Sequence, residues 1–363
     1  MAKSSQNSAL DNEILNSIKR SRIIRPTLLG LSVVIWMMYR QLDGDALKEI
    51  QWSATTIFWV LMAILAYAIR HLFYSWRLRT MTQNEFSWPK SMQLIVLWEF
   101  ASAVSPTSVG GSGVALFMLA QEKLSAAKTV SVVLYSMVLD TLFFVLSLPI
   151  IYLILGAGMI RPGMKSLSDL DGFGFTFIGV LLFMTAYGIL FWYGLFKNPN
   201  LIKRILLFIS KWKILKRFKE NLRSTAMDVV STSRDIQNQP LPFHLKSMLS
   251  TTGAWVFRFI AINCIILAFV NSTPTDFMNQ LLIYGRSETM HVTTSFTPTP
   301  GGAGVAEYLF GGYFSDFVPQ GISSLLALIW RLITYYTYLI GGAIIIPFWI
   351  RSIMISRKHS SSK

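Results

Sequence analysis

Two runs of proline, threonine and glycine lie far apart in the sequence and resemble each other. The first is SPTSVGGSGVA at 105–115, and the second is TPTPGGAGVA at 297–306. With one gap, seven positions carry the same residue. Proline interrupts a helix, and a helix that begins after it presents free N–H groups and the positive end of its dipole. Two such helix starts predict a binding site for an anion such as a phosphate.

The candidate anion-binding residues contribute either a hydroxyl group or uncovered backbone. They are Thr107, Gly110, Gly111, Gly113, Thr299, Gly301, Gly302 and Gly304. Glycine lets a ligand or a second backbone approach closely. Close packing of helices uses glycine for the same reason, so packing without a ligand remains the alternative.

Charged side chains inside apolar segments form a second group of candidates. Such charges are costly in a membrane and usually face the protein interior. Arg258, Arg286 and Glu288 are expected to line a polar cavity that receives a lipid headgroup. The other intramembrane charges are Glu99, Asp140, His291, Glu307 and Arg331.

Ion pairs that fix helix packing are the alternative for these charges. Asp140 and Arg331 each lie about ten residues into an apolar segment, so both are near mid-membrane at about 1.5 Å per residue. We expect these two side chains to pair. A titrating His291 that couples transport to protons is a further hypothesis.

Long apolar segments must position these residues. The chain has 363 residues, of which 53% are hydrophobic and 14% charged, against about 25% charged in soluble domains. This composition excludes a soluble enzyme and a typical nucleic-acid-binding domain. A membrane helix needs about 20 apolar residues. The segments that qualify are 23–40, 53–74, 129–156, 173–196, 246–270 and 321–350.

The two segments that contain the runs, 92–120 and 277–315, are apolar but interrupted. Broken backbone is tolerated at membrane depth only inside protein or beside water. The sequence therefore predicts an all-α polytopic membrane protein with six full spans and two re-entrant helical hairpins. The alternative is that each limb of a hairpin crosses as a short span.

The distribution of positive charge predicts the orientation. The formal net charge is +15, and 26 of the 33 Lys and Arg residues fall on one side of the predicted topology. The positive-inside rule makes that side cytoplasmic, with both termini inside. Segments 1–22 and 351–363 are then cytoplasmic. Segment 197–223 is predicted to be a basic amphipathic helix on the membrane surface, or otherwise a plain charge anchor.

An internal repeat follows from the two runs. Asp140 lies 27 residues after Gly113, and Arg331 lies 27 residues after Gly304. In the predicted topology the two copies have opposite orientation in the membrane. The transmembrane domain spans 23–350, with repeat one at about 23–156 and repeat two at about 173–350. Inverted repeats are a recurring plan of secondary transporters. Chance likeness of composition is the alternative.

Cysteine and histidine indicate no metal chemistry. Cys264 is the only cysteine, which excludes an intramolecular disulfide, and the four histidines have no ligand-like spacing. No metal and no cofactor are expected.

Two motifs carry a resemblance to a known family. The run PTPGGAGVAE at 298–307 and the run WRLITY at 330–335 resemble motifs of the lysylphosphatidylglycerol synthase transmembrane region, a flippase-like family of UPF0104 type. The resemblance spans about 20–350. Ser136 and Met137 stand where the family often has Glu-Arg, and only 13 residues follow the last span, so no aminoacyltransferase domain is expected.

The resemblance implies a multi-pass inner-membrane protein that moves lipids between leaflets and is not itself an enzyme. The expected partners are membrane lipids: an anionic or aminoacylated phospholipid, or a polyprenyl-phosphate-linked lipid. No nucleic-acid partner is expected, and a homo-oligomer is left open. The alternatives are a membrane glycosyltransferase, or its accessory subunit, acting on polyprenyl-phosphate-linked sugars, and a membrane scaffold without transport.

Overall fold

The computed structural model describes most of the chain after residue 51. The described residues are 52–105, 108–122, 124–209, 211, 223, 226–227, 230, 233–295, 297, 299–302 and 304–361. These residues form helices and no strands, which confirms the all-α prediction for this part of the chain. The expected span at 23–40, segment 1–22 and Thr107 lie outside the described residues.

Five helices in the described part are long and apolar enough to cross a membrane, and they coincide with five of the predicted spans. They are α4 (Ala54–Met81), α7 (Ala126–Leu155) with η1 (Gly156–Met159), α8 (Gly172–Phe196), α11 (Leu241–Phe269), and α14 (Gln320–Arg331), which continues through η5 (Leu332–Tyr336) into α15 (Thr337–Ser361). Many large apolar side chains on these helices remain exposed, as expected where lipid replaces water as the solvent.

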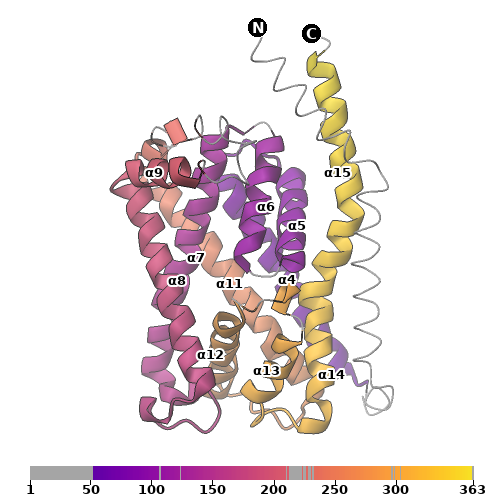
Figure 1. The fold of residues 1–363 in the computed structure, drawn as a ribbon. Helices are drawn as coiled ribbons and strands as arrows, with labels where there is room; N and C mark the ends of the chain where they lie inside the picture. The colour runs from indigo at the N-terminus through magenta and orange to yellow at the C-terminus, as the bar shows by residue number, and fades with distance from the viewer. Residues whose placement is uncertain are drawn as a thin grey trace.

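Two short helical hairpins lie between the long helices. The first consists of α5 (Trp88–Val104) and α6 (Ser108–Gln121), and the second of α12 (Phe277–Thr294), η4 (Pro300–Gly302) and α13 (Val305–Tyr313). Figure 1 shows α5 and α6 at the end of the bundle that carries α9 (Pro199–Ile209) and the C-terminus, and α12 and α13 at the opposite end. The hairpins therefore enter the bundle from opposite ends, and their tips meet near its middle.

The breaks in the hairpins follow from the sequence. Ser105 ends α5 in an extended conformation directly before a proline, where the α conformation is disfavoured. In the second hairpin Gly301 has φ +58° and Gly304 has φ +84°. Because side chains disfavour positive φ, glycine permits the sharp change of direction that precedes α13.

Close packing of helices holds the hairpins in place. α4 packs along α11, where Gly253 faces the ring of Phe73, and α15 packs on α5, where Gly342 faces Phe100. The buried apolar side chains form separate clusters between α4, α5 and α7, between α11, α13 and α14, and between α7, α8 and α11. The space that these clusters leave between them contains the polar cavity described next.

Helix caps and the C-terminal segment complete the fold. Asp276 caps α12 by accepting a hydrogen bond from the backbone N–H of Asn279, and hydrogen bonds from Asn279 lower the pKa of the Asp276 carboxyl. The predicted basic helix at 197–223 is represented by α9, and most of 210–222 lies outside the described residues. Segment 351–361 continues α15 as helix.

Candidate functional site

A cavity of about 250 Å³ lies where the two hairpins meet the long helices. Its walls come from α4, α5, α7, α8, α11, α12 and α13, from α14, η5 and α15, and from the loop before α13. Eight residues singled out from the sequence line it: Glu99, Asp140, Arg258, His291, Thr299, Gly301, Gly302 and Arg331. Segments more than 200 residues apart in the chain thus form one polar site.

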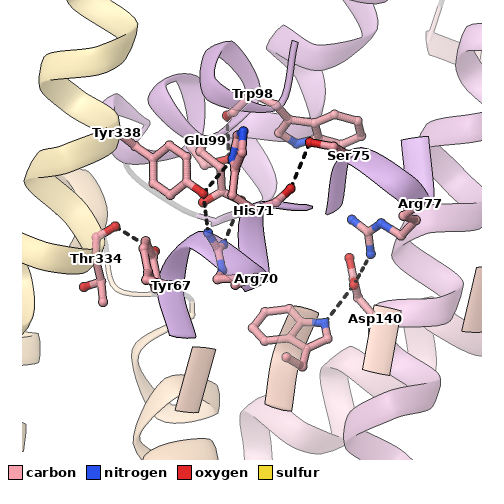
Figure 2. Close-up of polar contacts among 12 residues, drawn as sticks. Tyr67, Arg70, His71, Ser75, Arg77, Trp98, Glu99, Asp140, Thr334 and Tyr338 are labelled. Carbon is pink, nitrogen blue, oxygen red and sulfur yellow. Dashed lines mark hydrogen bonds and ion pairs between the residues drawn. The ribbon is translucent and has the colours of Figure 1, made fainter. Parts of the chain in front are cut away.

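Glu99 pairs with a fully buried arginine. Arg70 of α4 lies 2.9 Å from the Glu99 carboxylate and donates a hydrogen bond of 3.0 Å to the hydroxyl of Tyr338 (Figure 2). Its guanidinium also stacks on the rings of Tyr67 and Tyr74, at 4.7 and 4.6 Å. Burial of this cation is compensated by one carboxylate and by aromatic faces. The arrangement ties α4, α5 and α15 together.

Asp140 pairs with Arg77 and not with Arg331, so the predicted Asp140–Arg331 pair is wrong. The Arg77 and Asp140 side chains lie 2.5 Å apart (Figure 2). The indole N–H of Trp255 donates to the same carboxylate at 2.8 Å. Both interactions place Asp140 at the junction of α4, α7 and α11. The predicted pair failed because each member has a nearer partner of opposite charge.

Arg331 pairs with Glu307 at the start of α13. The Arg331 Nε lies 3.1 Å from the Glu307 carboxylate, and its Nη1 donates to the Gly301 carbonyl at 2.8 Å. The guanidinium stacks on the ring of Tyr335 at 3.8 Å, and the Tyr335 hydroxyl donates to the Ala103 carbonyl at 3.1 Å. Tyr335 therefore connects the tip of the second hairpin to the end of α5.

Glu307 also occupies the N-terminus of α13. Its carboxylate accepts a hydrogen bond of 2.7 Å from the backbone N–H of Gly304. A negative side chain at this position already compensates the positive end of the helix dipole. In the first hairpin, Gly110, Gly111 and Gly113 lie in the first two turns of α6. The α13 N-terminus is therefore a poorer anion site than the sequence alone predicted.

Arg258 differs from the other arginines of the cavity. Within the described part of the chain no carboxylate lies within ion-pair distance of it. Its guanidinium lies 5.4 Å from the ring of Trp255, and its side chain is only partly buried. A cation with this environment is available to an anionic ligand in the cavity.

His291 is surrounded by aromatic rings. It stacks on Phe144 at 5.7 Å with an interplanar angle of 24°, and it also contacts Trp255 and Phe259 at 4.9 and 5.8 Å. Together these rings form an aromatic wall of the cavity, and Trp255 also contacts Asp140 and Arg258. The hypothesis that His291 couples transport to protons stays untested.

Two predicted cavity residues lie elsewhere. Arg286 forms an ion pair with Asp316 and donates to the carbonyls of Gly158 and Tyr313, at 3.0 and 3.3 Å. Glu288 accepts a hydrogen bond of 2.9 Å from Ser147. Neither Arg286 nor Glu288 is among the cavity-lining residues, because they lie on faces of α12 that pack against neighbouring helices.

Arg70 and Arg77 were not among the site residues predicted from the sequence. The predicted span 53–74 ends before Arg77, whereas α4 continues to Met81 and buries both arginines. One signal was available: Tyr67, Arg70, Tyr74 and Arg77 recur at helical spacing on one face of α4.

Comparison with known proteins agrees with this architecture. Residues 23–342 match the lysylphosphatidylglycerol synthase TM region. The chain belongs to this family. It is a multi-pass integral membrane protein, and the resemblance noted from the motifs at 298–307 and 330–335 is confirmed.

A second comparison supports membership of the family. The chain is 24% identical over 318 residues to a UPF0104 membrane protein of Archaeoglobus fulgidus, and the alignment covers 83% of this chain and 90% of that relative. No solved structure gives a significant match.

Proposed function

We propose that the protein moves a lipid with an anionic phosphate headgroup between the leaflets of the membrane. The observation that carries the proposal is Arg258, a cation inside the cavity without a carboxylate partner among the described residues. The headgroup would enter the cavity while its acyl chains remain in lipid. Membership of a family named for a lipid synthase agrees with a lipid-related role.

The balance of charge around the cavity favours a single negative charge on the ligand. Arg70, Arg77 and Arg331 each have a carboxylate partner, so their charges are neutralised within the protein. Arg258 therefore gives the cavity one positive charge that no described carboxylate neutralises. A phosphodiester supplies one negative charge and accepts charge-assisted hydrogen bonds, and an aminoacylated headgroup presents the same phosphodiester.

The arrangement of the hairpins supports movement between two sides. We take both hairpins as re-entrant segments that enter from opposite faces of the inner membrane, and the halves at 23–156 and 173–350 as an inverted repeat. Opposite hairpins give each half its own gate to the shared cavity. The end of the bundle that carries α9 and the C-terminus is then cytoplasmic, since the predicted topology assigns most Lys and Arg residues to that side.

Reconstituted vesicles test the proposal. We expect the wild-type protein to move a fluorescent phosphatidylglycerol between leaflets and to move a zwitterionic lipid at least about tenfold more slowly. Arg258→Ala should abolish movement and Arg258→Lys should retain part of it, because lysine keeps the charge but not the bidentate geometry. Arg204→Ala, an exposed residue of α9, is the matched control and should move lipid normally.

The outcomes separate the alternatives. Wild-type rates in Arg258→Ala would show that the cavity cation does not bind the headgroup. A new glycolipid formed when the purified protein is incubated with a polyprenyl-phosphate sugar and an acceptor would instead support the glycosyltransferase alternative.

A further inference from the structure

Glu288 of α12 is a buried carboxyl group that pairs with no cation among the described residues. Its side chain is fully buried. Oε2 accepts the hydrogen bond from Ser147 of α7 at 2.9 Å, whereas Oε1 has no hydrogen-bond partner. No Lys, Arg or His within the described ranges lies within ion-pair distance of Glu288. An ionised carboxylate in such a place costs several kcal/mol, so this packing favours a neutral carboxyl group.

Glu288 lies one helical turn from the cavity wall. On α12 it precedes His291 by three residues, and on α7 its partner Ser147 follows Phe144 by three residues. His291 and Phe144 stack on each other and line the cavity. The α7–α12 contact therefore has two adjacent levels, one of aromatic rings at the cavity and one formed by Ser147 and Glu288. A separation of α12 from α7 would open both levels together.

The charged and titratable groups around this contact give Glu288 no ion-pair partner among the described residues. Tyr284, one turn earlier on α12, places its phenol beside the Glu288 side chain. Arg286 pairs with Asp316. The remaining charged or titratable groups on the surrounding elements are His291 on α12, Arg258 facing the cavity from α11, Tyr313 on α13, which is hydrogen-bonded to Thr293, and Arg161 after η1, which pairs with Asp171.

We propose that Glu288 is the site at which the protein binds a coupling proton. The inference rests on the proposed transport function and names the ion that would drive it. With a proton on Oε1 the carboxyl is neutral and fits the dry contact between α7 and α12. After the proton leaves for water, the carboxylate needs hydration, which favours an arrangement with α12 apart from α7. Proton binding and release thus bias the second hairpin between closed and open.

A metal cation fits this site less well than a proton. Cations such as Ca²⁺ gather six to eight oxygen ligands. The hydroxyls next to Glu288 on α12 are already used, since Ser287 donates to the Ile283 carbonyl at 2.8 Å and Thr289 to the Gly285 carbonyl at 3.0 Å. The carboxylate and the Ser147 hydroxyl leave too few oxygens.

Infrared difference spectroscopy of the purified full chain tests the proton itself. We expect a carbonyl band of a protonated carboxyl group near neutral pH in the wild type, absent from Glu288→Gln and retained in Glu85→Gln. Glu85 is the matched control because it is an exposed carboxylate paired with Lys128. Glutamine has the shape of the protonated acid, so we expect Glu288→Gln to fold. The inference would be overturned if the wild type shows no such band, or if the band is unchanged in Glu288→Gln.

Vesicles with an imposed gradient test the coupling. One pH unit across the membrane corresponds to about a tenfold ratio for one coupled proton. We expect up to that asymmetry of fluorescent phosphatidylglycerol with the wild type and none with Glu288→Gln, although that variant should still equilibrate the lipid. Lipid movement that ignores the pH gradient, or that follows a sodium gradient, would contradict the inference but leave the transport function standing. Absence of any lipid movement by the wild type would contradict the transport function. The infrared experiment would still show whether Glu288 binds a proton.

Discussion

Arg77 and Asp140 form an ion pair of 2.5 Å that joins α4 to α7 at the edge of the cavity. The same Asp140 oxygen accepts a hydrogen bond from the indole of Trp255 on α11, so three long helices meet at one carboxylate. The Arg77 side chain is only 9% exposed. A pair with this burial is expected to hold the helices in one arrangement.

Asp140→Asn should destabilise the protein. The change removes the counter-charge of a buried arginine while keeping the size of the side chain. We expect a loss of about 1–3 kcal/mol, the cost of leaving a buried polar group without its partner. Thermal unfolding of the purified protein in detergent measures the effect. Asp235→Asn, at an exposed position before α11, is the matched control and should unfold like the wild type.

The double variant Arg77→Met with Asp140→Leu should recover part of that loss. Replacing both partners of a buried pair by apolar residues is often neutral, because no isolated charge remains. Equal stability of wild type and Asp140→Asn would show that the pair contributes nothing to the fold. A double variant less stable than either single variant would argue that the cavity edge needs both charges.

Gly301→Ala should damage the protein more than Gly304→Ala. Both positions have positive φ, +58° and +84°, so alanine carries a backbone cost of about 1–2 kcal/mol at each. At Gly301 the added Cβ would also clash with the ring of Tyr335, whereas at Gly304 it meets no described residue within 4 Å. Overpacking of this kind adds about 1–3 kcal/mol. Unfolding temperatures of the two variants give the comparison.

Adding Tyr335→Ala separates the two contributions. With the ring removed, Gly301→Ala should cost no more than Gly304→Ala, because only the backbone contribution remains. If Gly301→Ala is equally harmful in both backgrounds, the contact with Tyr335 is not its cause.

Cysteine labelling tests the orientation. Cys264 is the only cysteine and is buried, so Cys264→Ser gives a background without thiols. In that background Ser168→Cys, in the loop after η1, should react with a membrane-impermeant maleimide added to intact cells. Asn238→Cys, before α11, should react only after the membrane is permeabilised. The reverse pattern would invert the proposed topology, and labelling of both in intact cells would rule it out.

The sequence alone determined which segments cross the bundle and where they break. Five predicted spans coincide with helices because long apolar segments without charge have one stable solution in lipid. The breaks at Ser105 and Gly301 were also predictable, since proline and glycine act through the backbone and need no distant partner. The residue types of the cavity followed from the cost of charge in a membrane.

Only the tertiary structure decided which charge meets which. Asp140 pairs with Arg77 instead of Arg331, and Glu288 lies outside the cavity that Arg258 and His291 line. These outcomes depend on the rotation of each helix about its axis and on its height in the bundle. One turn changes the height by about 5.4 Å, which exceeds the reach of an ion pair. Packing between helices sets both quantities, and no single segment of sequence contains them.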